Sequence, residues 1–209
     1  YENAASRPER RNLSRVRAGE YEGLEEKLAD PAWAPDFGPS ELNTGAGATA
    51  VGAREFLVAY NIDLNTTDRR YANEIAYAIR ERGRWKRTGN IEPFYYKGTV
   101  LTFTDDGTYP CGPCDFVGAS FEQLEAHYRD EHGGDLRQRY AELDIDPDNP
   151  TGPVYTDGQF THVKGIGWVI DEFKRAQVSM NLTNAKEAPL HEVLEATRRV
   201  ALEEGVVVT

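Results

Sequence analysis

The chain has 209 residues, of which 39 % are hydrophobic and 28 % charged, so it is long enough for one large domain or two small ones with a substantial core. Its formal net charge of −11 is opposite in sign to the basic surface of non-specific nucleic-acid binders, which argues against a nucleic-acid partner. No apolar run approaches the roughly 18–20 residues of a membrane helix, and no signal-peptide pattern is present. We therefore expect a cytoplasmic protein that interacts with no membrane.

Acidic residues dominate the charge balance, with 35 Asp and Glu against 24 Lys and Arg. Arg greatly outnumbers Lys, which occurs only at positions 27, 86, 97, 164, 174 and 186. Many carboxylates and few lysines are typical of proteins in concentrated salt, where screening removes the self-repulsion of the acidic groups. The composition therefore favours a halophilic host, with an ordinary acidic protein as the alternative.

The N-terminal part is polar and contains one loose helical pattern. Arg7-Pro8-Glu9 is typical of a helix start, and apolar residues recur at helical spacing to about Ala29. Pro31 and Pro35 end this predicted helix, because proline cannot continue one. The small-residue segment 38–47 follows, and its three glycines fit either a plain linker or a loop whose backbone approaches a ligand.

Two blocks of regular structure follow, separated by residues 85–158. In the first block a strand over 55–64 precedes a helix over 69–82, which Thr67-Asp68 caps and Gly83 ends. The second block consists, in chain order, of a strand over 160–171, a strand over 177–182, a helix over 189–204 and a further strand after Gly205.

Leaving out residues 85–158 gives the order strand, helix, strand, strand, helix, strand, which is the split βαβ order of ferredoxin-like folds. The predicted fold class is therefore α+β: a ferredoxin-like subdomain, preceded by the end of a second α/β subdomain and interrupted by a small insertion. Gly165 and Gly167 in the predicted strand over 160–171 indicate a bulge or close packing.

The insertion carries the only two cysteines of the chain, Cys111 and Cys114. Two residues separate them, twelve separate Cys114 from His127, and four separate His127 from His132. This spacing matches a two-cysteine, two-histidine zinc finger, in which a tight turn holds two thiolates and one helical turn holds two imidazoles. Ser120 is placed to cap the finger helix.

Four filled ligand positions make the predicted zinc ion structural rather than catalytic. A redox Cys-x-x-Cys pair with incidental histidines is the alternative, but no thioredoxin-like strand–helix pattern surrounds the cysteines. DNA binding by the finger is disfavoured, because its helix carries four acidic residues and one arginine: Glu122, Glu125, Asp130, Glu131 and Arg129.

The regular parts of the chain resemble the folate-dependent glutamate formimidoyltransferase (formiminotransferase) family in many ordered runs. These runs are Ser6-Arg7-Pro8-Glu9-Arg10-Arg11-Asn12-Leu13, Arg17-Ala18-Gly19-Glu20-Tyr21-Glu22-Gly23-Leu24, Pro35-Asp36-Phe37-Gly38-Pro39, Gly47-Ala48-Thr49-Ala50-Val51-Gly52-Ala53-Arg54, Tyr60-Asn61-Ile62, Lys164-Gly165-Ile166-Gly167-Trp168, Arg175-Ala176-Gln177-Val178-Ser179-Met180-Asn181-Leu182 and Leu190-His191-Glu192-Val193. They cover the chain except for roughly residues 85–158.

The resemblance implies transfer of a formimino group from formimidoylglutamate to tetrahydrofolate, in a homodimeric enzyme whose two ferredoxin-like subdomains sandwich the folate. It implies that residues 1–53 are the end of the N-terminal subdomain and that 54–84 with 159–209 form the C-terminal one. Residues 85–158 are then an insertion, with the zinc finger at 111–132, which the resemblance does not explain.

The resemblance also implies a folate-binding loop of ten consecutive residues, namely Gly38, Pro39, Ser40, Glu41, Leu42, Asn43, Thr44, Gly45, Ala46 and Gly47. Arg54 and Arg175 become candidates for binding the carboxylates of the substrate or of the glutamyl tail, since Arg binds carboxylates through two parallel hydrogen bonds. Surface ion pairing is the alternative role for these two residues.

The chain departs from the family in lacking the His-Pro-Arg segment that carries the family's catalytic histidine. His162 and His191 do not lie in that context, so we assign no catalytic residue. We expect an N-terminally truncated transferase that is inactive by itself. The alternative is a zinc-finger interaction module on a ferredoxin-like scaffold without catalytic activity.

Overall fold

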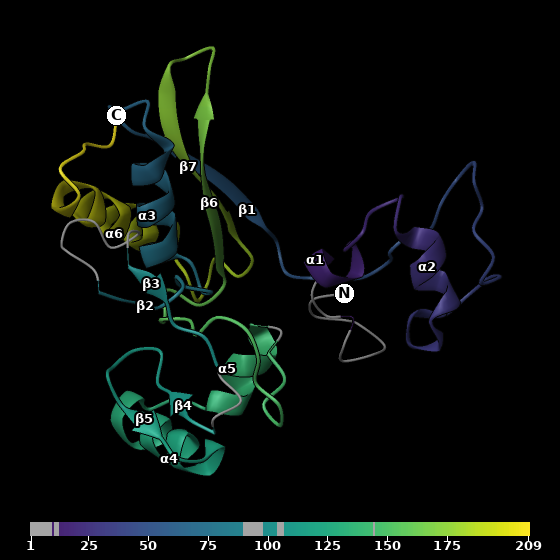
Figure 1. Cartoon of the computed structure of the whole chain (residues 1–209). Helices are drawn as coiled ribbons and strands as arrows, with labels where there is room; N and C mark the ends of the chain where they lie inside the picture. The colour runs from purple at the N-terminus through teal and green to yellow at the C-terminus, as the bar shows by residue number, and fades with distance from the viewer. Residues whose placement is uncertain (1–9, 11–12, 90–97, 104–106, 144) are drawn as a thin grey trace. The chain divides into compact units, whose positions relative to one another are not determined.

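The computed structural model describes residues 10, 13–89, 98–103, 107–143 and 145–209, and the chain divides into two compact units, Tyr1–Phe56 and Leu57–Thr209 (Figure 1). Each unit is described by itself. In residues 13–56 the first unit has the short α-helices α1 (Leu13–Val16) and α2 (Leu24–Ala29) and the 3-10 turn η2 (Pro31–Trp33).

The single helix predicted for this first unit is wrong, because the chain turns between α1 and α2. Gly19 has a φ of 80° and Glu20 a φ of 45°, both in the left-handed region that an α-helix cannot contain. Gly19 is therefore the residue that allows the helix to stop and restart. The predicted start at Arg7-Pro8-Glu9 lies outside the described residues.

One lysine and one tryptophan connect the short elements of the first unit. The Lys27 ammonium donates to the carbonyl oxygens of Arg15 and Val16, at 2.8 and 2.9 Å, at the end of α1. The same ammonium lies 4.1 Å from the centre of the Trp33 ring, and the Arg10 guanidinium lies 5.5 Å from it. Cation–π contacts of this kind stabilise a unit that has few buried apolar residues.

The second unit is built on an antiparallel three-stranded sheet with two helices on one face (Figure 1). Its elements are β1 (Val58–Asp63), α3 (Arg69–Ile79), β6 (Val163–Ile170), β7 (Arg175–Leu182) and α6 (Leu190–Glu203). The strand order is β1-β7-β6. The structure is therefore of the mixed α+β class with antiparallel pairing.

The core of this unit lies between the sheet and the helices. Alternate residues of β7, such as Val178, Met180 and Leu182, are buried against apolar residues of α3 and α6. The strand predicted after Gly205 is present only as one antiparallel bridge, Leu64↔Val208, which adds a fourth chain segment beside β1. The resulting order is residue 208, β1, β7, β6.

Gly167 allows β6 to pack closely on α3. A Cβ atom at this position would lie 2.5 Å from the carbonyl carbon of Ala72, which is closer than non-bonded carbon atoms approach. The Gly167 amide donates to Asn73 Oδ1 at 3.0 Å. The register between β6 and β7 is continuous, so the predicted glycine effect is close packing and not a bulge.

Helix α3 begins as predicted and ends earlier than predicted. Asp68 is its N-cap, and its carboxylate accepts the backbone amide of Arg70 at 2.9 Å. Arg80 already has extended backbone angles, so the helix does not continue to Gly83. The Arg80 guanidinium donates to the carbonyl oxygens of Gly83 and Gly165. These tertiary hydrogen bonds explain why the helix ends before the glycine.

Replacing the N-cap in Asp68→Ala should destabilise the second unit by about 0.5–2 kcal/mol, the usual effect of losing such a cap. Hydrogen bonds from Arg70 lower the pKa of Asp68. A carboxyl whose pKa is lower in the folded state stabilises that state above its ordinary pKa, and this contribution is lost as the pH falls through the folded pKa. Urea unfolding followed by circular dichroism between pH 7 and roughly pH 2 measures both effects.

Asp68→Asn is the matched control, because its amide oxygen caps the helix without titrating. It should retain most of the stability at neutral pH and show a smaller acid loss than the wild type. Equal acid losses in the wild type and in Asp68→Asn would contradict the assignment of the pH dependence to this cap.

Residues between α3 and β6 form a second, smaller structure with its own core (Figure 1). Its elements are β2 (Arg87–Thr88), β3 (Thr99–Val100), β4 (Tyr109–Pro110), β5 (Val117–Gly118), α4 (Phe121–His132) and α5 (Leu136–Glu142). The pairs β2–β3 and β4–β5 are antiparallel. The buried residues of this core are Cys111, Phe121, Leu124, Tyr128, Leu136 and Tyr140.

The two chain segments that connect this smaller structure to the sheet and helices, 80–88 and 153–160, lie side by side, and we call them the neck. Backbone hydrogen bonds pair them: the Thr156 amide donates to the Arg84 carbonyl at 2.9 Å, and the Lys86 amide to the Val154 carbonyl at 2.8 Å. The Trp85 indole also donates to the Tyr155 hydroxyl at 2.8 Å. The smaller structure is therefore joined to the sheet and helices at one place.

Candidate metal site and folate loop

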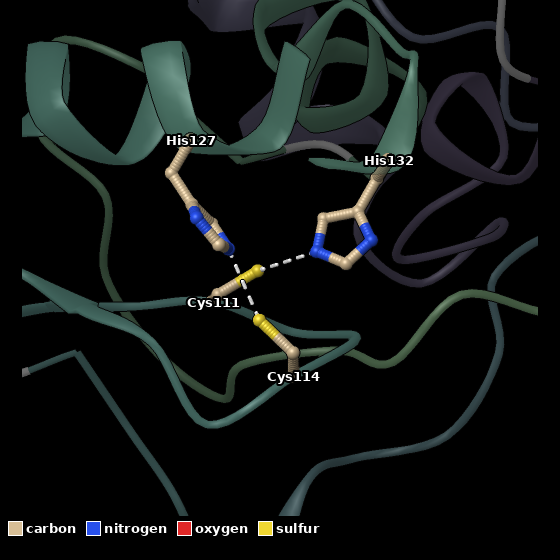
Figure 2. Close-up of side chains that lie close together, drawn as sticks. All are labelled: Cys111, Cys114, His127 and His132. Atoms are coloured by element: carbon tan, nitrogen blue, oxygen red, sulfur yellow. Dashed lines mark hydrogen bonds between the residues drawn. The ribbon is translucent and has the colours of Figure 1, made fainter. Parts of the chain in front are cut away.

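The two cysteines and two histidines of the insertion converge on one point (Figure 2). Their candidate ligand atoms all lie within 4.8 Å of one another. Cys114 Sγ is 3.0 Å from His127 Nε2, and Cys111 Sγ is 3.5 Å from His132 Nε2. Two thiols and two imidazoles in this arrangement are the donor set that zinc prefers, with each side chain offering one ligand atom.

Local structure around the cysteines brings the two sulfur atoms together. Cys111 follows β4, and its amide donates to the carbonyl oxygen of Phe116 at 2.8 Å, which closes the turn between β4 and β5. Cys114 lies within that turn. The hairpin therefore holds both sulfur atoms on the side that faces α4 (Figure 2).

Both histidines lie on α4, which is capped at both ends. The Ser120 hydroxyl accepts the backbone amide of Gln123 at 3.3 Å, as its position in the sequence predicts. Gly133 ends the helix with a φ of 71°, the left-handed conformation that glycine adopts readily. The caps determine which residues lie in the last turns of α4 and so place His127 and His132 on the face toward the cysteines.

Aromatic neighbours orient the two imidazoles. The ring of Phe116 is stacked on that of His127, with centroids 3.9 Å apart and an interplanar angle of 12°. The ring of Tyr128 lies 5.4 Å from that of His132. Such packing restricts ring rotation and directs both imidazoles at the cysteine sulfur atoms.

Burial and a nearby cation have opposite effects on the pKa of the Cys111 thiol. Its side chain is only 1 % exposed, and burial raises the pKa of Cys111 to about 12, which the Lys86 ammonium opposes. A thiol with this pKa is protonated at neutral pH. A metal ion binds the thiolate and displaces the proton, so binding at this site should release protons.

Four side chains surround the candidate site, and each offers one ligand atom. A catalytic zinc ion normally has three protein ligands and one exchangeable water. The four ligand atoms offered here match the number that a structural zinc ion requires.

The predicted folate loop, residues 38–47, is ordered by hydrogen bonds of its own. The Asn43 side chain accepts the amides of Gly45 and Ala46, both at 3.0 Å, and its carbonyl oxygen accepts the amide of Gly47 at 2.7 Å. The Tyr21 hydroxyl donates to the Thr44 carbonyl at 2.9 Å. The segment is thus a defined turn on the first unit.

Two of the loop glycines require the conformation that glycine favours. Gly38 has a φ of 89° and Gly47 a φ of 65°, whereas Gly45 has no positive φ. A Cβ atom on Gly47 would have ordinary contacts with the Tyr21 ring at 3.6 Å, so backbone angle and not space excludes other residues there.

The two candidate carboxylate-binding arginines belong to different units, each of which is described separately. Arg54 is exposed and donates to the Glu55 carbonyl at 3.1 Å. Arg175 donates to Thr209 Oγ1 at 2.9 Å and lines an open depression with Thr66 and Lys174. Among the described residues, neither guanidinium donates a hydrogen bond to a carboxylate.

Two residues beside the candidate metal site were not anticipated from the sequence. The Lys86 ammonium donates to the carbonyl oxygen of Cys111 at 2.9 Å and also to that of Cys114. The Asp157 carboxylate accepts the Tyr128 hydroxyl at 2.7 Å. Both residues lie 25 or more positions from their partners, and no local spacing marks contacts of that kind.

Among the described helices, none is long and apolar enough to cross a membrane.

The mixed α+β class and the runs quoted above agree with the comparison with known families. Residues 59–209 match the model of the formiminotransferase domain, and residues 1–54 match the model of its N-terminal subdomain. The chain belongs to the formiminotransferase domain family. The resemblance found in the sequence is thereby confirmed.

Individual relatives carry the corresponding names. A formimidoyltransferase-cyclodeaminase of Dictyostelium discoideum is 32 % identical over 203 residues, which are 97 % of this chain and 25 % of that protein. A glutamate formimidoyltransferase of Streptococcus pyogenes is 51 % identical over 83 residues, covering 40 % of this chain and 28 % of the relative. One of Thermoplasma acidophilum is 27 % identical over 208 residues, covering 99 % and 44 %. The chain thus spans between a quarter and a half of the length of these relatives.

Proposed function

We propose that this chain is part of a glutamate formimidoyltransferase, which transfers the formimino group of N-formimidoyl-L-glutamate to tetrahydrofolate in histidine degradation. The observation that carries the proposal is the family match over residues 1–54 and 59–209. Relatives that carry the transferase name support it. The proposed enzyme is a cytoplasmic homodimer, and its co-substrate is tetrahydrofolate.

In this reaction a folate amine attacks the formimino carbon and glutamate leaves, so a group must accept and return a proton. The proposed contribution of this chain is to bind substrates and not to transfer that proton. His127 and His132 are engaged with the cysteines, and His191 is exposed on α6 beside Glu192. We assign no catalytic residue and expect no turnover from these 209 residues alone.

The proposed division of the chain follows the family. Residues 1–53 end the N-terminal subdomain, and 54–84 with 159–209 form a ferredoxin-like C-terminal subdomain around the insertion 85–158. The order of segments in the sheet, residue 208, β1, β7, β6, supports the ferredoxin-like assignment, because the split βαβ order places the last strand beside the first.

The proposed cofactor of the insertion is one structural zinc ion held by Cys111, Cys114, His127 and His132. The convergence of the four ligand atoms supports it. A zinc ion bound by these residues would join the β4–β5 hairpin to α4. The side chains of the insertion themselves position the ligands, through the caps of α4 and the stacking on Phe116.

The alternative function is that of a zinc-finger interaction module on a scaffold that has lost catalysis. The closed metal site favours it, since a structural finger offers a surface and no reaction. Folate binding separates the two functions, because a scaffold kept only for interactions has no reason to retain the ligand loop.

The change Gly47→Val tests the folate loop. Valine disfavours the positive φ at this position, so the turn should distort and folate affinity should fall by about 1–3 kcal/mol, which is roughly five- to a hundredfold. Titration of the complete gene product with tetrahydrofolate, followed by fluorescence, measures the dissociation constant. Zinc content should not change, since the cluster lies in the other unit.

A thermal melt of Gly47→Val distinguishes loss of binding from loss of folding. Gly45→Ala is the matched control for the turn, because Gly45 has no positive φ and a Cβ atom there would contact only Asn43 Oδ1 at 3.5 Å. An unchanged dissociation constant in a folded Gly47→Val protein would show that residues 38–47 are a plain connector.

A further inference from the structure

Three separate contacts join the candidate metal site to the neck. The first contact is electrostatic. The Lys86 ammonium, on one segment of the neck, donates to the carbonyl oxygens of both Cys111 and Cys114. Its side chain is only 12 % exposed, so a buried cation is directed at the turn that holds both sulfur atoms.

The second contact is steric. Gly112 lies between the two cysteines, and a Cβ atom on it would come within 3.0 Å of the carbonyl carbon of Tyr155 on the other segment of the neck. The backbone of the metal-binding turn is therefore packed directly against the backbone of the neck. Any movement of this turn changes what Tyr155 contacts.

The third contact comes from the finger helices. Tyr128 follows the ligand His127 on α4, and its hydroxyl donates to Asp157 Oδ2 at 2.7 Å. Arg139 of α5 donates from Nε to Asp157 Oδ1 at 3.0 Å. One neck carboxylate thus binds both helices of the finger, through hydrogen bonds to a charged acceptor, which are the stronger class.

The neck is in turn hydrogen-bonded to the end of α3. The Gln159 amide donates to the Ala78 carbonyl at 2.9 Å, and the Phe160 amide to the Ile79 carbonyl at 3.1 Å. A Cβ atom on Gly158 would lie 2.7 Å from the carbonyl carbon of Arg80. The last turn of α3 therefore has its carbonyl groups satisfied by the neck.

We propose that metal binding in the finger controls the local stability of the neck and of the last turn of α3. The inference rests on the proposed zinc site. A finger with six buried core residues cannot remain folded without its metal ion, and its loss removes Tyr128, Arg139 and the cysteine turn from the neck. The neck segments and the end of α3 then open more often, while the rest of the sheet keeps its own core.

Amide hydrogen exchange of the whole chain, with zinc bound and after chelation with EDTA, tests this inference. Peptides covering 80–84 and 156–160 should exchange about tenfold faster or more after zinc removal, because exchange reports local opening. Peptides from β7 should exchange at an unchanged rate, because this strand is central in the sheet.

The change Tyr128→Phe removes the hydrogen bond to Asp157 and retains the four ligands. This variant should keep one zinc ion per chain and should already show faster exchange in 156–160 while zinc is bound. Tyr109→Phe is the matched control, since it deletes a hydroxyl beside the same small core that forms no hydrogen bond with any described residue. Its exchange should equal that of the wild type.

The outcomes separate the two proposals. Freshly prepared protein without zinc would refute the metal site and this inference together. Protein that binds zinc but exchanges equally with and without it in 80–84 and 156–160 would refute the inference alone. Equal acceleration in β7 would also refute it, since that result reports global unfolding and not a local effect on the neck.

Discussion

The change Cys111→Ser should abolish zinc binding and unfold the finger, which is the largest effect that we expect for a single substitution in this chain. Structural zinc contributes about 10–16 kcal/mol to the folding of zinc-finger peptides near neutral pH. This contribution requires that the ligands be deprotonated. Serine does not supply a thiolate, and three remaining ligands hold the ion far less tightly. The small core of the finger has too few buried residues to compensate.

Elemental analysis should find about one zinc ion per chain in the wild type and close to none in Cys111→Ser. Limited proteolysis should cut the variant within residues 107–143 and leave the same segment intact in the wild type. His191→Gln is the matched control, because its side chain is 82 % exposed and lies outside the cluster. Zinc retained after both cysteines are changed to Ser would contradict the ligand assignment.

The change Gly167→Ala should produce the second large effect, on the stability of the sheet and helices of Leu57–Thr209. The added Cβ atom would lie 2.5 Å from the Ala72 carbonyl carbon and 2.8 Å from Ala72 Cβ, so β6 and α3 must separate. Overpacking of this kind costs about 1–3 kcal/mol and occasionally more. The hydrogen bond from the Gly167 amide to Asn73 would also lengthen.

Gly165→Ala is the matched control, because Gly165 lies on the same face of the same strand. Its added Cβ atom would meet Met180 Cγ at 3.5 Å and Ala76 Cβ at 3.7 Å, which are ordinary contacts. Thermal melting should show a clear decrease for Gly167→Ala and a small change for Gly165→Ala. Equal shifts in the two variants would contradict the close approach of β6 to α3.

Features with a local cause were predictable from the sequence. The spacing of Cys111, Cys114, His127 and His132 is a property of one turn and one helix, and the caps Ser120 and Asp68 each act within three residues. Family membership was predictable for a different reason, since ordered runs of identical residues along a chain leave little room for coincidence. These are signals that a single sequence carries without knowledge of tertiary contacts.

Features with a distant cause were not predictable. The predicted end of α3 was wrong because Arg80 bonds to the carbonyl group of Gly165, 85 residues away. The prediction of a single N-terminal helix was wrong because a glycine such as Gly19 can occur in either a helix or a turn. Here Gly19 has a positive φ, and Lys27 binds the carbonyl oxygen of Arg15 at the end of α1. Lys86 and Asp157 likewise become part of the candidate metal site only after folding.

The antiparallel pairing of the two neck segments has a consequence for the size of the structure between them. Because Arg84 and Thr156 are hydrogen-bonded neighbours, the excursion between them starts and finishes at one point, so its size does not alter the geometry of the surrounding fold. The entropy of closing a loop grows only logarithmically, by about 0.6 kcal/mol per doubling of length. The free-energy cost of replacing a short hairpin here by a larger folded structure is therefore small. Additional folded structure can be accommodated at this position without changing the sheet and helices.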